Sequence, residues 1–155
     1  MSDDAKFAEA YQALGKYLSE FSALERELGE AVKAVLNLQG HDAADIVVAA
    51  LRFPAIKADL VKDAVAVAKN ADGTETSDEW KAKAKKTLGE ILSHNENSRN
   101  PLAHWHLEPQ EDGAIKLAPR KQPTDQKTWN LKHKIEEVLR LTEQLRTITH
   151  GSDHT

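Results

Sequence analysis

The sequence contains no cysteine among its 155 residues. This absence excludes a disulfide scaffold, thiol catalysis and any cysteine-ligated metal or cluster. Aromatic residues are also few, at 5% of the chain, whereas Ala, Leu, Lys and Glu are abundant. This composition favours helices, because aromatic and β-branched residues are the ones enriched in strands.

Long hydrophobic runs and a strong net charge are missing as well. The longest strongly apolar run lies near Ile46–Leu51, far short of the roughly 20 residues of a membrane-spanning helix. The start, MSDDAKF, is acidic and lacks the basic-then-apolar layout of a signal peptide. The net charge of −4 argues against a bulk electrostatic attraction to DNA but allows a local basic patch. We therefore expect a cytoplasmic protein that does not enter a membrane.

Hydrophobic periodicity predicts a long first helix over residues 4–38. Its predicted seam repeats in steps of three and four and consists of Phe7, Tyr11, Leu14, Leu18, Phe21, Glu25, Leu28, Val32 and Val35. A second helix is expected from Asp42 to about Asn70, with a kink or short break at Pro54.

The second half of the chain predicts two further helices around a hairpin. A capping box of Thr76 and Glu79 should start the third helix, and Pro101 should end it near Asn100. Residues 103–108 and 114–117 flank a turn-rich loop and predict a short β-hairpin. Thr124 or Asp125 should cap a last helix to about Thr149.

These elements predict an all-α fold, an antiparallel four-helix bundle with the hairpin between the third and last helices. We expect one domain over residues 1–150 and a flexible tail over residues 151–155.

Polar residues interrupt two of the apolar faces. Glu25 is the one charged member of the first seam. It either lies at the edge of the seam, with Leu24 filling the core, or is buried with a cationic partner. The third helix offers such a partner, because its apolar stripe turns polar at Asn95 and then at Ser98 or Arg99. A Glu25–Arg99 ion pair is therefore one hypothesis.

The segment SRNPLAHWH places several potentially catalytic side chains at a predicted helix-to-strand junction. Arg99, Asn100, His104 and His106 fall within eight residues. In a strand beginning near His104, residues 104, 106 and 108 would share one face. The cluster is either a surface histidine pair beside a helix end or a catalytic site on a rigid support. An H-x-H zinc site with His94 or Glu108 is a further alternative, although no third ligand is obvious.

Residues 99–104, with the form R-N-x-x-x-H, resemble the signature of HEPN domains. These are small helical domains of prokaryotic toxin–antitoxin, abortive-infection and CRISPR-associated systems. The resemblance implies a metal-independent endoribonuclease without a cofactor, in which the ribose 2′-OH attacks the adjacent phosphate and leaves a 2′,3′-cyclic phosphate. It also implies a homodimer, with two motifs facing one cleft, and an antitoxin or regulatory partner.

Carried over onto this chain, the resemblance makes Arg99, Asn100 and His104 the catalytic set. Arg99 would stabilise charge on the phosphate, Asn100 would orient the site, and His104 would be the acid/base. Glu25, Asn95 and His106 are supporting candidates, and no metal ligand is expected. One toxin branch carries a Tyr that its partner modifies at the position of His106, so that mode of neutralisation is not expected here.

The chemistry suits these residue types independently of the resemblance. In-line attack needs one group to accept a proton and another to donate one, and a symmetric dimer supplies His104 twice. The planar fork of Arg can bond two phosphate oxygens. The alternative function is a non-catalytic helical adaptor of the same fold, in which His104 would be replaceable. Trp105 could be a core residue or a base-stacking platform.

Overall fold

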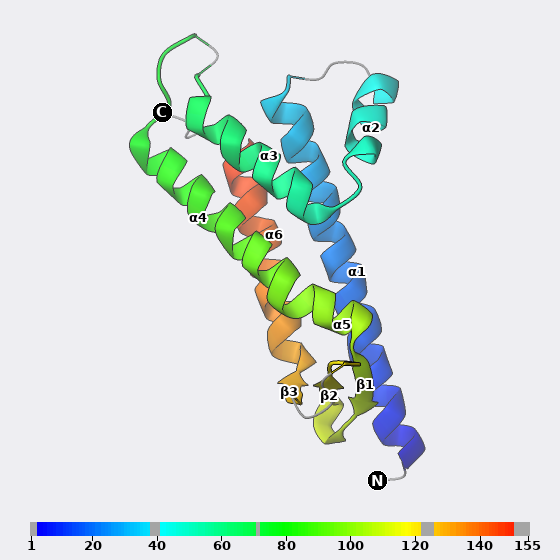
Figure 1. Cartoon of the computed structure of the whole chain (residues 1–155). Helices are drawn as coiled ribbons and strands as arrows, with labels where there is room; N and C mark the ends of the chain where they lie inside the picture. The colour runs from blue at the N-terminus through cyan, green and yellow to red at the C-terminus, as the bar shows by residue number, and fades with distance from the viewer. Residues whose placement is uncertain (1–2, 38–40, 71, 122–125, 151–155) are drawn as a thin grey trace. The chain divides into compact units, whose positions relative to one another are not determined.

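The computed structural model describes residues 3–37, 41–70, 72–121 and 126–150 (Figure 1). The chain is mostly helical with a small antiparallel sheet. Its elements, in order, are α1 (Asp3–Val35), α2 (His41–Ala50), α3 (Pro54–Val67), α4 (Asp78–His94), a π-helical turn (Asn95–Arg99), α5 (Asn100–His104), β1 (His106–Pro109), a 3₁₀ turn (Glu111–Gly113), β2 (Ala114–Ala118), β3 (Lys127–Asn130) and α6 (Leu131–His150).

Contacts divide the chain into two compact units. Residues 1–23 and 94–140 form one unit, which contains the strands and is called the sheet unit below. Residues 24–93 and 141–155 form the other, called the helical unit. Helices α1 and α6 contribute residues to both units. The single domain over residues 1–150 stays a prediction, and residues 151–155 lie outside the described part of the chain.

The sheet has the order β1-β2-β3, with both pairs antiparallel. The predicted hairpin is confirmed as β1 and β2, but β1 starts at His106 because helical geometry continues through His104. The register sets Leu107, Leu117 and Lys127 in one row across the three strands. Leu117 is fully buried at the centre of this row, whereas Lys127 at its β3 end is exposed.

Strand β3 is an element that the sequence pattern missed. Residues 127–130 were expected to be helical, but they pair with β2 instead. Helix α6 begins at Leu131, where the side-chain oxygen of Asn130 accepts a hydrogen bond from the backbone N–H of Lys132 at 3.0 Å. Asn130 therefore acts as the cap. The predicted caps, Thr124 and Asp125, lie outside the described residues.

The buried seam of α1 overlaps the predicted one but is shifted by one residue at several positions. The predicted members that are buried are Phe21, Leu28 and Val32. Tyr11 and Leu18 are exposed, whereas Tyr17 and Leu24 are fully buried. Both sets repeat in steps of three and four, so periodicity alone does not choose between two adjacent stripes. Glu25 is half-buried next to Leu24, as the edge-of-seam alternative expects.

Two helix boundaries in the helical unit depend on single residues. The break before Pro54 is confirmed, because Pro54 is the first residue of α3 and Phe53 before it is extended. The capping box at Thr76 is wrong. The Ser77 hydroxyl oxygen accepts a hydrogen bond from the backbone N–H of Trp80. The buried Thr76 hydroxyl donates a hydrogen bond to the Ala68 carbonyl. One residue therefore caps the helix while its neighbour ties the preceding turn to α3.

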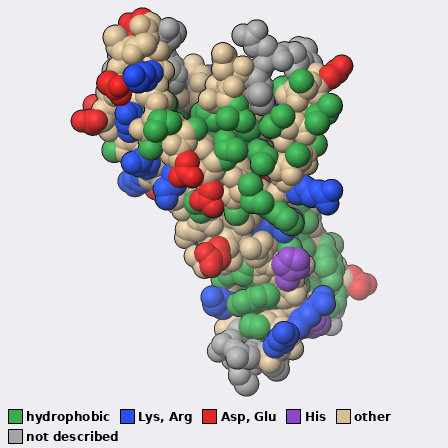
Figure 2. All heavy atoms as spheres, turned by 45° about the horizontal axis from the view of Figure 1, so that its top comes forward, with side chains coloured by type: hydrophobic (Ala, Val, Ile, Leu, Met, Phe, Trp, Pro, Cys, Tyr) green, Lys and Arg blue, Asp and Glu red, His purple; other side chains and the backbone are tan. Residues whose placement is uncertain are grey.

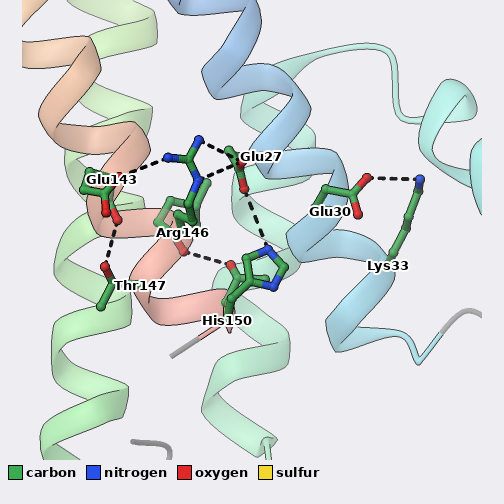
Figure 3. Close-up of polar contacts among 9 residues, drawn as sticks. Glu27, Glu30, Lys33, Glu143, Arg146, Thr147 and His150 are labelled. Atoms are coloured by element: carbon green, nitrogen blue, oxygen red, sulfur yellow. Dashed lines mark hydrogen bonds and ion pairs between the residues drawn. The ribbon is translucent and has the colours of Figure 1, made fainter. Parts of the chain in front are cut away.

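Ion pairs join helices of the helical unit on its surface. Arg146 of α6 points toward Glu27 of α1 and also contacts Glu143 on its own helix (Figure 3). Lys33 of α1 contacts Glu30 and lies 2.8 Å from Asp45 of α2. Each of these cations has two carboxylate partners.

Within the described ranges, every helix is either too short or too polar to span a lipid bilayer.

Candidate functional site

A π-helical turn carries the motif residues. The N–H of Asn100 donates to the carbonyl of Asn95, five residues back, and α5 continues through Pro101 to His104. The prediction that the helix ends at Asn100 is therefore wrong, since Asn100 keeps helical angles of φ −63° and ψ −46°. A π turn is wider than an α turn, and this widening accommodates a proline that lacks an N–H and crowds the preceding turn.

Arg99 is the last residue of the π turn and is half-buried. Its Nε atom is buried and has no hydrogen-bond partner among the residues that the structure describes. Its guanidinium carbon lies 5.9 Å from the centroid of the Phe21 ring. A guanidinium against an aromatic face is favourably placed, but its donors still require acceptors.

Asn100 and His104 are the first and last residues of α5. A spacing of four places them on the same face of the helix. His104 is exposed, whereas Asn100 is half-buried. Arg99, Asn100 and His104 thus lie on one continuous helical segment of the sheet unit.

His106 lies in β1 and is exposed, as is Glu108 on the same face of the strand. The expectation that His104 shares this face is wrong, because His104 is helical. Asn95 is buried at the start of the π turn. Glu25 belongs to the helical unit, and its ion pair with Arg99 stays a prediction.

A buried polar chain next to the π turn was missed by the sequence analysis. The Tyr17 hydroxyl lies 2.8 Å from Nε2 of His94, and Nδ1 of His94 lies 3.0 Å from a carboxylate oxygen of Glu137. A proton on Nδ1, facing this carboxylate, leaves Nε2 free to accept the hydrogen bond of Tyr17. His94 falls three residues after the buried Ile91, so helical spacing contained the signal.

Burial determines the ionisation of this chain. Desolvation lowers the pKa of His94, with the Glu137 carboxylate opposing this effect. Desolvation also raises the pKa of the Tyr17 hydroxyl, with Arg99 opposing it. The Phe21 ring stacks on both side chains, at 6.2 Å from Tyr17 and 6.1 Å from His94. Arg99 therefore rests against an aromatic cluster that is itself held by the polar chain.

Two lysines lie over tryptophan rings in the same unit. Lys127 Nζ is 5.5 Å from the Trp105 ring centroid, and Lys134 Nζ is 4.5 Å from that of Trp129. Histidine and basic side chains lie beside hydrophobic ones on the sheet-bearing part of the face in Figure 2. The surface next to the motif is thus both basic and aromatic.

Within the described ranges, no three His, Asp or Glu side chains are grouped so that they could hold a metal ion. His94, one of the ligands considered for a zinc site, is engaged by Tyr17 instead. Comparison with known proteins gave no match to a family model, a curated protein or a solved structure.

Proposed function

We propose that this chain is a metal-independent endoribonuclease of the toxin–antitoxin or phage-defence type, acting in the cytoplasm. The observation that carries the proposal is Arg99. It is half-buried on a helical turn, its Nε atom is buried, and no described residue supplies it with an acceptor. A cation in this state binds an anion well, because the cost of removing it from water has already been met by folding.

The neighbouring residues supply the remaining chemistry. His104 is exposed on the same helical segment and accepts or donates a proton during attack of the 2′-OH on phosphate. Asn100 shares the helix face of His104 and orients the phosphate or the imidazole. His106 is a second exposed imidazole two residues further on.

A homodimer completes the proposed site. In-line cleavage requires both a proton acceptor and a proton donor, and two copies of His104 facing one cleft meet this requirement. We further propose that the helices form a HEPN-like four-helix bundle, and that an antitoxin or regulatory protein controls the enzyme.

The test is cleavage of a mixed RNA in EDTA by the wild type and by His104→Ala, with analysis of the product ends. We expect the wild type to leave 2′,3′-cyclic phosphates and the variant to lose at least about 100-fold in rate. His133→Ala is the matched control, because His133 is also an exposed histidine of the sheet unit.

A His104→Ala variant with full activity would contradict the proposal. A folded, dimeric wild type that cleaves no RNA would favour the non-catalytic adaptor instead.

A further inference from the structure

Trp105 lies between the two exposed histidines of the motif region. It is half-buried at the junction of α5 and β1, and its backbone N–H donates to the carbonyl of Pro101 at 2.8 Å. This hydrogen bond fixes the backbone of Trp105 at the end of the helix. Trp105 is itself extended, with φ −86° and ψ 160°, so its indole lies on the opposite face of the chain from His106, directly after His104 in the sequence.

Lys127 approaches this indole from a distant strand. Strand β3 is separated from β1 by β2, and Lys127 stands opposite Leu117 of the middle strand. The lysine side chain is exposed, and within the described ranges no carboxylate or hydrogen-bond acceptor engages its ammonium group. Among the described residues, its interaction is with the face of the Trp105 ring.

The second lysine–tryptophan pair of this unit differs in one respect. Lys134, over Trp129, is half-buried and donates a hydrogen bond to the buried Ser98 at 2.9 Å. That lysine is held in place by the fold. Lys127 has no such bond to any residue that the structure describes, so its side chain can move from the indole to a phosphate at little cost.

We propose that Trp105 and Lys127 form a nucleotide subsite for single-stranded RNA, in which a base stacks on the indole and Lys127 binds the adjoining phosphate. This inference rests on the proposed function and names the form of its substrate. An indole face stacks any unpaired base, whereas a base inside a duplex is already stacked and is not available. The position of Trp105, one residue from His104, places the stacked nucleotide next to the bond to be cleaved.

Binding is measured with an RNA that the enzyme cannot cleave, so the result does not depend on catalysis. The probe is a labelled 12-nucleotide RNA with 2′-O-methyl groups, titrated by fluorescence anisotropy, alone and annealed to its complement. We expect the single strand to bind more tightly than the duplex. Trp105→Ala should weaken single-strand binding by about 5- to 150-fold, and Trp105→Phe by less.

Salt dependence tests the lysine separately. Lys127→Ala should lower the slope of log Kd against log salt by about one. Lys85→Ala is the matched control, because Lys85 is an exposed lysine of α4 in the helical unit, and it should leave the slope unchanged. Quenching of indole fluorescence by the RNA in the wild type, lost in a folded Trp105→Phe variant, would confirm stacking on this ring.

Three results would overturn the subsite: equal binding of single strand and duplex, wild-type affinity in both Trp105 variants, or no binding of the probe. If Trp105→Ala does not fold, Trp105→Phe and the salt slope of Lys127→Ala decide the question. The proposed function would fail by a different result, the absence of cleavage of ordinary RNA, so the two failures are distinguishable.

Discussion

Arg99 of the sheet unit and Arg146 of the helical unit differ in the side chains that contact them. In the helical unit, the Arg146 guanidinium lies within 3.1 Å of Glu27 and 3.0 Å of Glu143. In the sheet unit, Arg99 rests on the Phe21 ring, and its buried Nε has no acceptor among the described residues. A cation with two carboxylates joins helices and has few donors left for a ligand. Arg99 has no carboxylate partner among the described residues, so its positive charge is not neutralised within the described part of the fold and can attract an anion.

Aromatic residues show the same contrast. The helical unit contains Phe53 and Trp80, while the other six aromatic residues of the chain, Phe7, Tyr11, Tyr17, Phe21, Trp105 and Trp129, belong to the sheet unit. Of these rings, Phe21 contacts Arg99 and Trp105 lies directly after His104, so part of this aromatic set flanks the motif. The comparison therefore separates a unit whose surface cations are paired with carboxylates from one that contains the candidate site.

The largest predicted effect contrasts the two arginines directly. Arg99→Ala should lower the rate of RNA cleavage by about 100-fold or more, because a donor to the developing phosphate charge is lost. Arg99→Lys should recover only part of this rate, since an ammonium lacks the planar fork. Arg146→Ala should leave cleavage unchanged and lower the urea midpoint of unfolding. Equal loss of cleavage in both alanine variants would contradict the assignment of a catalytic role to Arg99 and a purely structural role to Arg146.

A second prediction concerns the buried polar chain of the sheet unit. Tyr17→Phe leaves Nε2 of His94 buried without a partner, which should cost about 1–3 kcal/mol in free energy of unfolding. Urea denaturation followed by circular dichroism measures this cost. Tyr11→Phe on the same helix is the control, because Tyr11 is 60% exposed and its substitution should change stability by less than about 0.5 kcal/mol. Similar values for the two variants would show that the Tyr17 bond contributes nothing.

The third prediction is a dependence of stability on pH that resides in the sheet unit. Burial lowers the pKa of His94 below its ordinary value of 6.5, so the unfolded chain binds this proton more readily. The contribution of His94 to stability is therefore present above pH 6.5 and is lost as the pH falls toward the lowered pKa. The slope from one group cannot exceed about 1.4 kcal/mol per pH unit.

Urea unfolding at several pH values between 5 and 7.5 measures this slope, and His94→Gln should reduce it. Titration of the His94 imidazole by NMR is the direct check. Glu137→Gln should lower the His94 pKa further, because the carboxylate raises it. A His94 pKa above 6.5 in the folded protein would contradict the prediction.

The smallest effect compares two glycines of α1, one in each unit. A Cβ at Gly15 would meet no atom within 4 Å, so Gly15→Ala should stabilise the chain by up to about 1 kcal/mol through helix propensity. A Cβ at Gly29 would lie 3.1 Å from Val48 Cγ1 of α2, so Gly29→Ala should gain less or lose stability. Thermal melting of both variants measures the difference in stability. Equal gains would show that Val48 of α2 can move away from the new Cβ without loss of stability.

The sequence was most informative where a single residue has a dominant local effect. Pro54 marks the start of α3, and the turn-rich loop marks the β1–β2 hairpin. Arg99, Asn100 and His104 could be proposed as a site because their spacing is local and needs no knowledge of packing. The residue types and their R-N-x-x-x-H spacing together identified these candidates.

Features that depend on tertiary contacts could not be predicted. Tyr17 is buried in place of Leu18 because two adjacent stripes have the same periodicity, and only packing selects between them. Lys127–Asn130 has a polar composition typical of a helix start, yet it forms a strand because it pairs with the edge of β2 that β1 leaves open. Pro101 stops an ordinary helix, but the π turn before it removes the conflict.

This π turn has a consequence for the tolerance of the chain to insertion and deletion. A helix with one surplus residue in a turn returns to ordinary α geometry when any one residue of that turn is deleted. Deletion of Asn97 would restore α-helical spacing, bring Pro101 into conflict with the turn before it, and rotate Arg99, Asn100 and His104 by about 100° relative to His94. The loss of one residue outside the motif would thus leave the motif's sequence intact and still change the direction of all its side chains.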